Sequence, residues 1–260
     1  MGVNTPPTLK SIIADSLHLG MENSCLTFAT PTAIAGDRSS VDLAAHEISH
    51  SWFGNGIGCA SWSHFWLNEG WTTYLERLLM REVHGEGERQ LSYIVGRRAL
   101  KQDLALNKDN LRFQRLVVEY KENEDPDDGY NQVPYEKGSN FLLHLERTVG
   151  GLDHFIPYMK DYVKTFNGTS ITTDQWRSHL FHYFGRQADS ASYLKKLGKV
   201  DWDAWLHGDG PDLCVDLEYD DSLSKPAMDL AERWNASRSE KFPSEFSLKD
   251  VEAFSTSQKG

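Results

Sequence analysis

A short apolar stretch, AAHEISHSWFG at residues 44–54, is the feature that most constrains how this chain can fold. It places His46 and His50 four residues apart, with Glu47 directly after the first histidine. On an α-helix, positions i and i+4 lie on one face, so both imidazoles can reach one point in space. Glu47 leaves the helix at a different angle and can reach a water molecule beside that point. The stretch therefore predicts a helix that carries two converging imidazoles.

The flanking residues predict where this helix begins and ends. Ser39 or Ser40 is a suitable N-cap, and Asp42 falls in the first turn, where a negative charge is favourable. Gly54 is suited to the position just after a helix. We therefore expect one helix over residues 41–53, with the two histidines in its middle.

A third metal ligand is available downstream. Glu69 lies in WLNEGWTTYLE, separated from His50 by 18 residues, at the start of a second expected helix over about 67–83. This gap is long enough for a loop and an antiparallel return of the chain. Catalytic zinc usually takes three protein ligands and leaves one position for water. The alternative is a chance HExxH on a surface helix, but the apolar neighbours of the histidines favour burial and hence one zinc ion.

Composition narrows the class of protein. The 260 residues carry a net charge of −11, which disfavours binding to nucleic acid or to an anionic membrane surface. Three cysteines without a CxxC pair indicate neither a disulfide framework nor a thiolate metal site. No run of 18 apolar residues is present. We expect a globular protein of a reducing compartment, the cytoplasm and in addition the nucleus.

The remaining pattern is mainly helical. Residues 21–34 are rich in β-branched and aromatic residues and predict one or two short extended segments. The acidic residues 122–134 predict a loop, and 207–226 a linker. Further helices are expected at four places, namely 89–106, 136–149, 152–166 and 173–186. The fold class is therefore mainly α with a small β portion, an α+β arrangement.

Four ordered motifs carry a family resemblance: GMEN at 20–23, HEISH at 46–50, NEG at 68–70 and VPYEKG at 133–138. Together they resemble the M1 family of zinc aminopeptidases, the gluzincins. SITTDQW and VDWDAWL further along the chain are similar to the same family. This implies a hydrolase that removes N-terminal residues from peptides.

The resemblance also implies a domain organisation. A thermolysin-like catalytic lobe is expected over 20–206, a linker over 207–226 and the start of an α-helical C-terminal domain over 227–260. Residues 1–19 do not resemble the family and stay unassigned, and Leu19 stands where a glycine is expected. Because family members carry a β domain before the catalytic lobe, we expect this chain to be a truncated form. The strand leading to Glu22 is then expected at a loosely held sheet edge.

The residue roles follow from the same motifs. The resemblance implies His46, His50 and Glu69 as zinc ligands, Glu47 as the general base, and Tyr135 as the donor to the oxyanion of the tetrahedral intermediate. It further implies that Gly20, Met21 and Glu22 bind the substrate, with the Glu22 carboxylate holding its free α-amino group.

Three assignments retain an alternative. In one branch of the family a fatty-acid epoxide is also opened, and Tyr130 and Asp127 match its deeper pocket; a solvated loop charge is the alternative for Asp127. Glu76, seven residues after Glu69, can hydrogen-bond a zinc-bound histidine or lie on the helix surface. The four tryptophans, which are expected to pack in the core or else to line the substrate site, are Trp52, Trp62, Trp66 and Trp71.

Two other functions compete with a zinc hydrolase. The first is a catalytically silent zinc-binding fragment that lacks the N-terminal β domain and hence part of the substrate cleft. The second is a helical interaction module with an accidental HExxH, which one equivalent of bound zinc would exclude.

Overall fold

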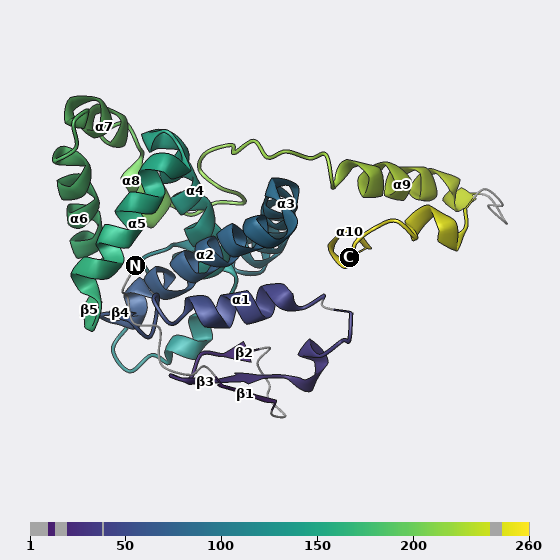
Figure 1. Ribbon diagram of the computed structural model, residues 1–260, viewed down its shortest axis with the longest axis horizontal. Coiled ribbons are helices and arrows are strands. Elements are labelled where there is room, and N and C mark those ends of the chain that lie inside the picture. Colours follow the sequence, from purple (N-terminus) through teal and green to yellow (C-terminus); the bar gives the residue numbers. More distant parts are fainter. Residues whose placement is uncertain (1–9, 14–19, 38, 240–245, 260) are drawn as a thin grey trace.

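The structure is a computed structural model, and it describes residues 10–13, 20–37, 39–239 and 246–259 (Figure 1). The expectation for Leu19 lies outside these residues. The described part is mainly helical with a small β portion, as expected. Its α-helices are α1 Val41–Ser49, α2 Trp66–His84, α3 Glu86–Leu106, α4 Gly138–Val149, α5 Leu152–Phe166, α6 Thr173–Gly185, α7 Ser190–Leu197, α8 Trp202–Leu206, α9 Lys225–Ala236 and α10 Thr256–Lys259. Its strands are β1 Lys10–Ile13, β2 Gly20–Met21, β3 Leu26–Ala29, β4 Ile57–Cys59 and β5 Thr169–Ile171.

A three-stranded sheet of order β1-β3-β2 lies beside α1 (Figure 1). β1 runs parallel to β3, and β2 runs antiparallel to it, with Gly20 opposite Ala29. β2 is thus an edge strand of this sheet, and Glu22 follows it directly. A second, two-stranded sheet pairs β4 with the distant β5 in parallel, and sequence reasoning did not predict it.

The first expected helix ends earlier than residue 53. α1 stops at Ser49, and the amides of Ser51 and Trp52 bond carbonyls three residues back, which tightens the last turn. His46 therefore lies in the last turn and His50 is the C-cap, so the motif is at the end of the helix and not in its middle. Gly54 is not the residue just after the helix. Its φ of +117° reverses the chain toward β4, and an added Cβ would crowd the His50 ring.

α2 forms the centre of the core. Its side chains Trp66, Trp71 and Tyr74 have no solvent exposure, and the helix packs against α1, α3 and α4. Gly70 lies against Gly138 of α4, where neither position has room for a Cβ without backbone movement. This close approach sets the spacing of the two helices.

The other expected helices are present with small differences in their bounds, as α3, α4, α5 and α6. The largest difference precedes α4. Residues Val133–Lys137 form a π-helix, where a loop followed by an α-helix was expected. Short helices α7 and α8 were missed.

The linker was expected over 207–226; residues 207–224 contain no helix or strand, and α9 begins at Lys225, within the expected range. Leu213 and Leu217 of this segment are buried in the core, and Arg97 of α3 forms ion pairs with Asp212 and Asp216. α9, which follows, has no buried residue and lies apart from α1, α2 and α4 to α8, beyond α3 (Figure 1). The domain limits given above remain a prediction. No helix in the described part of the chain is long and apolar enough to cross a membrane.

Candidate metal centre and active site

The three expected metal ligands converge between α1 and α2. Glu69 Oε2 lies 3.4 Å from His46 Nε2 and 3.4 Å from His50 Nε2. One ligand atom from each of the three residues can be chosen so that all lie within 4.8 Å of one another. Glu69 Oε2 is buried and has no hydrogen-bond partner within the described residues. An orphaned carboxylate oxygen between two imidazole nitrogens fits a zinc ion, because His and Glu are ordinary ligands of catalytic zinc.

The far side of each imidazole is fixed by a hydrogen bond. His46 Nδ1 lies 2.9 Å from Glu76 Oε2, and His50 Nδ1 lies 2.8 Å from the carbonyl oxygen of Phe53. Thr72 donates its hydroxyl to the same carbonyl at 3.0 Å. Because carboxylate and carbonyl oxygens only accept, both Nδ1 atoms donate, and both Nε2 atoms carry the lone pair that a metal needs. Glu76 therefore makes the contact expected for it.

Without a metal, the carboxylates control protonation at this centre. Burial opposes a charge on His46, but the nearby carboxylates of Glu69 and Glu76 outweigh it and raise the pKa of His46 to about 10. Burial likewise opposes a charge on Glu69, yet the two histidines lower the pKa of this carboxyl to about 2. A cation bound by these residues would displace the proton that the raised pKa favours on His46.

Glu47 projects from α1 into the same space. Burial raises the pKa of its carboxyl to about 7, and its Oε2 has no partner in the described structure. Glu22, Glu47 and His50 also bring ligand atoms within 4.8 Å of one another. Gly20 allows this approach of β2 to α1, because a Cβ there would overlap with Glu47 Oε1. Asn55, which sequence reasoning did not select, donates its amide to the Glu22 carbonyl at 2.6 Å.

Tyr135 of the π-helix lies beside the expected metal ligand His46. Its ring stacks on that of His46 with 6.0 Å between centroids, and its hydroxyl lies 3.1 Å from that of Tyr130. Burial raises the pKa of Tyr135 well above its usual value, so the phenol keeps its proton. Tyr130 and Asp127 are exposed at the rim of the same space, and Asp127 is thus both solvated and near the site.

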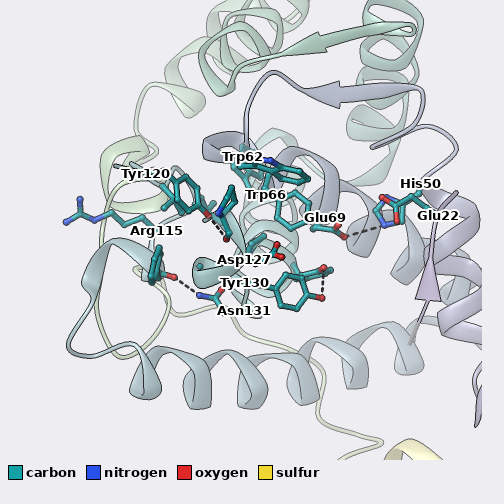
Figure 2. A pocket seen from close by; sticks show the side chains of 18 of the residues that line it. Glu22, His50, Trp62, Trp66, Glu69, Arg115, Tyr120, Asp127, Tyr130 and Asn131 are labelled. Carbon is teal, nitrogen blue, oxygen red and sulfur yellow. Dashed lines mark hydrogen bonds and ion pairs between the residues drawn. The ribbon is translucent and has the colours of Figure 1, made fainter. Parts of the chain in front are cut away.

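These groups share a cavity of about 430 Å³. In Figure 2, Glu22 and His50 lie at one end of it, and Arg115 and Tyr120 lie at the other. Every expected site residue except Glu76 lines the cavity. Its largely apolar wall includes Trp62, which the sequence offered as a residue of the substrate site, and Phe113, Leu116, Val118 and Pro126, which no motif indicated. Of the four tryptophans, Trp62 and Trp66 line this cavity, Trp62 with 55% exposure and Trp66 fully buried. Trp71 is fully buried in the core, and Trp52 packs against the core while partly buried.

Known proteins place the chain in a family. Residues 6–205 match the Peptidase family M1 domain. "Leucine aminopeptidase 2" of Aspergillus niger is 42% identical over 92% of this chain, and the "Leukotriene A-4 hydrolase homolog" of Botryotinia fuckeliana is 44% identical over 92%. The match spans only 37% and 35% of those two relatives.

A solved yeast LTA4 hydrolase in complex with bestatin superimposes with a TM-score of 0.87 at 39% identity, covering 93% of this chain and 38% of that one. The resemblance inferred from the four motifs is therefore confirmed, including its leukotriene A4 hydrolase branch. The chain belongs to peptidase family M1.

Proposed function

We propose that this protein is a zinc-dependent aminopeptidase that removes N-terminal residues from peptides. The observation that carries the proposal is the orphaned Glu69 oxygen between the two histidine Nε2 atoms, with the unpartnered Glu47 carboxylate beside it. His46, His50 and Glu69 would hold one zinc ion. When bound, zinc would polarise the scissile carbonyl and lower the pKa of a water molecule at the site toward ~7.

The remaining steps belong to side chains of this protein. Glu47 accepts a proton from the attacking water on a carboxylate oxygen and delivers it to the leaving amine. The protonated hydroxyl of Tyr135 donates a hydrogen bond to the developing oxyanion. Glu22, held by Asn55 beside Glu47, accepts the free α-amino group of the peptide. Because ligand atoms of Glu22, Glu47 and His50 lie within 4.8 Å of one another, an amino group held by Glu22 places the first peptide bond of the substrate beside Glu47.

A pair of substrates tests this function. The zinc content of the purified chain is measured first, and the protein is then assayed with leucyl, alanyl and arginyl p-nitroanilides and with their N-acetyl forms. We expect one zinc per chain, turnover of the free-amine substrates and none of the acetylated ones, because acetylation removes the charge that Glu22 binds. Stoichiometric zinc without turnover would instead support the catalytically silent zinc-binding chain. Absence of zinc binding would contradict both.

Epoxide hydrolysis is a second candidate, and the apolar wall of the cavity favours it. The apolar side chains of Phe113, Leu116 and Val118, which line the cavity, would contact a fatty-acid chain, and Asp127, which also lines it, would direct a water molecule. Tyr135→Phe distinguishes the two reactions, because the tetrahedral oxyanion forms only in peptide hydrolysis. We expect this variant to lose peptidase activity and to retain most of any epoxide-opening activity; equal losses would contradict the distinction.

The proposed compartment is the cytoplasm, which the three free cysteines support because a reducing environment keeps thiols unpaired.

A further inference from the structure

A buried ion pair behind the active site connects α2 to the π-helix that carries Tyr135. Arg77 of α2 is 2% exposed and donates from Nη2 to both carboxylate oxygens of Glu136, each at 2.8 Å. Glu136 directly follows Tyr135 in the π-helix. Consecutive helical side chains point in different directions, so Tyr135 faces the cavity while Glu136 faces the helical core.

The remaining donors of Arg77 are also engaged. Its Nη1 donates to Ser139 Oγ of α4 at 2.7 Å, and its Nε donates to Ser92 Oγ of α3 at 2.9 Å. The guanidinium also lies over the Tyr93 ring, with 4.3 Å between Arg77 Cζ and the ring centroid. The guanidinium therefore joins three helices to the π-helix at one point. Planar, multidentate contacts of this kind fix geometry more strictly than apolar packing does.

A second buried ion pair also joins α2, α3 and α4, so the contacts of Arg77 are not needed merely to hold these helices together. Arg89 of α3 already pairs with Glu146 of α4, and Tyr74 of α2 donates its hydroxyl to the same carboxylate at 2.6 Å. The same three helices are thus joined without Arg77. What Arg77 adds is a connection to Glu136, beside the catalytic tyrosine.

We propose that Arg77 and Glu136 form a positioning pair that holds the Tyr135 hydroxyl at the distance from the metal ligands that peptide hydrolysis requires. Glu69 and Arg77 belong to the same rigid helix, so the pair fixes the π-helix to the element that supplies a metal ligand. The inference rests on the proposed role of Tyr135. Neither Arg77 nor Glu136 lines the cavity, so both act through the tyrosine.

Gly96 provides a mild way to disturb the pair. It lies in α3 beside Glu136, and an added Cβ would overlap with the Glu136 carboxylate. Gly96→Ala therefore pushes the carboxylate away from Arg77 while keeping both charges, and alanine favours the helix. Glu136→Gln removes the charge itself. Glu146→Gln is the matched control, because it breaks the other buried pair between the same helices.

The experiment uses the zinc-loaded chain and a leucyl p-nitroanilide. For Gly96→Ala and Glu136→Gln we expect full zinc content, a fall in kcat of about 10- to 100-fold and little change in KM, because an oxyanion donor acts only in the transition state. Glu146→Gln should keep the parent kcat per bound zinc. In a Tyr135→Phe background, Gly96→Ala should cause no further loss, because the two changes then act on one interaction.

A second readout does not depend on activity. Hydrogen exchange of the backbone amides of Val133, Tyr135, Glu136 and Lys137 should accelerate at least ~10-fold in Gly96→Ala and Glu136→Gln, relative to Glu146→Gln. Three results would each overturn the proposal. They are an unchanged kcat in both variants, a loss of kcat from Gly96→Ala that is as large in the Tyr135→Phe background as in the parent, and amide exchange no faster than in Glu146→Gln. If the zinc-loaded parent shows no turnover, the proposed function fails, and the exchange measurement still decides whether the pair holds the π-helix.

Discussion

The proposed reaction depends on the Glu47 carboxylate as the group that accepts a proton. Its carboxylate is buried, and its Oε2 lacks a partner in the described structure. The pKa of this carboxyl is raised to about 7 by burial, which suits a group that must both accept and release a proton near neutral pH. The glycine at position 20 leaves room for it. At the residue scale, the site therefore depends on one free carboxylate and on the absence of one side chain.

Glu47→Gln tests the carboxylate. We expect the variant to bind one zinc ion with unchanged stoichiometry, because the proposed ligands are His46, His50 and Glu69 and not Glu47. Turnover of leucyl p-nitroanilide should fall by about 10²- to 10⁴-fold, since an amide cannot accept the proton. Retention of more than about a tenth of the parent rate would contradict the role of Glu47 as general base.

Gly20→Ala tests the space around Glu47. The new Cβ displaces Glu47 Oε1, so we expect kcat/KM to fall by at least ~10-fold with zinc retained. Gly185→Ala is the control, because an added Cβ there meets only ordinary contacts with Leu194. A Gly20→Ala variant as active as Gly185→Ala would show that β2 can shift without affecting the site.

At the element scale, α2 organises the site. Within two turns it supplies Glu69 to the metal centre, Glu76 to the outer nitrogen of His46, and Arg77 to Glu136. The face that carries Glu69 and Glu76 meets α1, whereas Arg77 meets α3, α4 and the π-helix. One rigid element thus aligns groups that approach the cavity from opposite sides.

Ion pairs hold residues 207–224 to α3, and they predict that the unfolding free energy depends on pH. Burial disfavours the Asp212 carboxylate, but Arg97 and Lys101 outweigh it and lower the pKa of Asp212 to about 2. A carboxyl with a lowered pKa contributes stability above its unfolded pKa of about 4 and loses it as the pH falls toward 2.

The difference in unfolding free energy between the parent and Asp212→Asn should therefore be constant above about pH 5 and vanish near pH 2. Urea unfolding across this range measures it. Asp216→Asn is a comparison, because its carboxylate is largely exposed and its effect should be smaller. A difference for Asp212→Asn that does not change with pH would show that the carboxylate is not ionised through this pair.

At the scale of the whole molecule, the cavity joins segments that are far apart in sequence. β2, α1, α2, residues 113–120 and the π-helix each contribute part of its wall. The proposed metal ligands come from α1 with its C-cap and from α2, so a bound cation would add a further link between two helices that the His46–Glu76 hydrogen bond already joins. The metal should therefore stabilise the fold as well as the site.

Zinc removal tests this link. A ligand that binds only the folded state at ~100 times its Kd adds about 2.7 kcal/mol to the unfolding free energy. We expect chelation to lower the melting temperature of the parent and added zinc to restore it. His46→Ala should show no zinc-dependent shift, and a shift equal to that of the parent would mean that zinc binds elsewhere.

The sequence by itself determined the parts of this protein that depend on local spacing. HEISH and the later glutamate identified Glu47 and the expected ligand set, because i and i+4 positions share a helix face whatever surrounds them. Helical periodicity placed α2 and α4 to α6 to within a few residues. The family followed from four motifs in order.

Only the tertiary structure decided where distant segments meet. The end of α1 is set by the turn that brings the Phe53 carbonyl to His50, and β4 exists because β5, over a hundred residues later, pairs with it. The π-helix is held by the buried charge pair between Arg77 and Glu136. None of these has a local signal, because hydrogen bonds and ion pairs between distant residues form only after packing has brought their partners together.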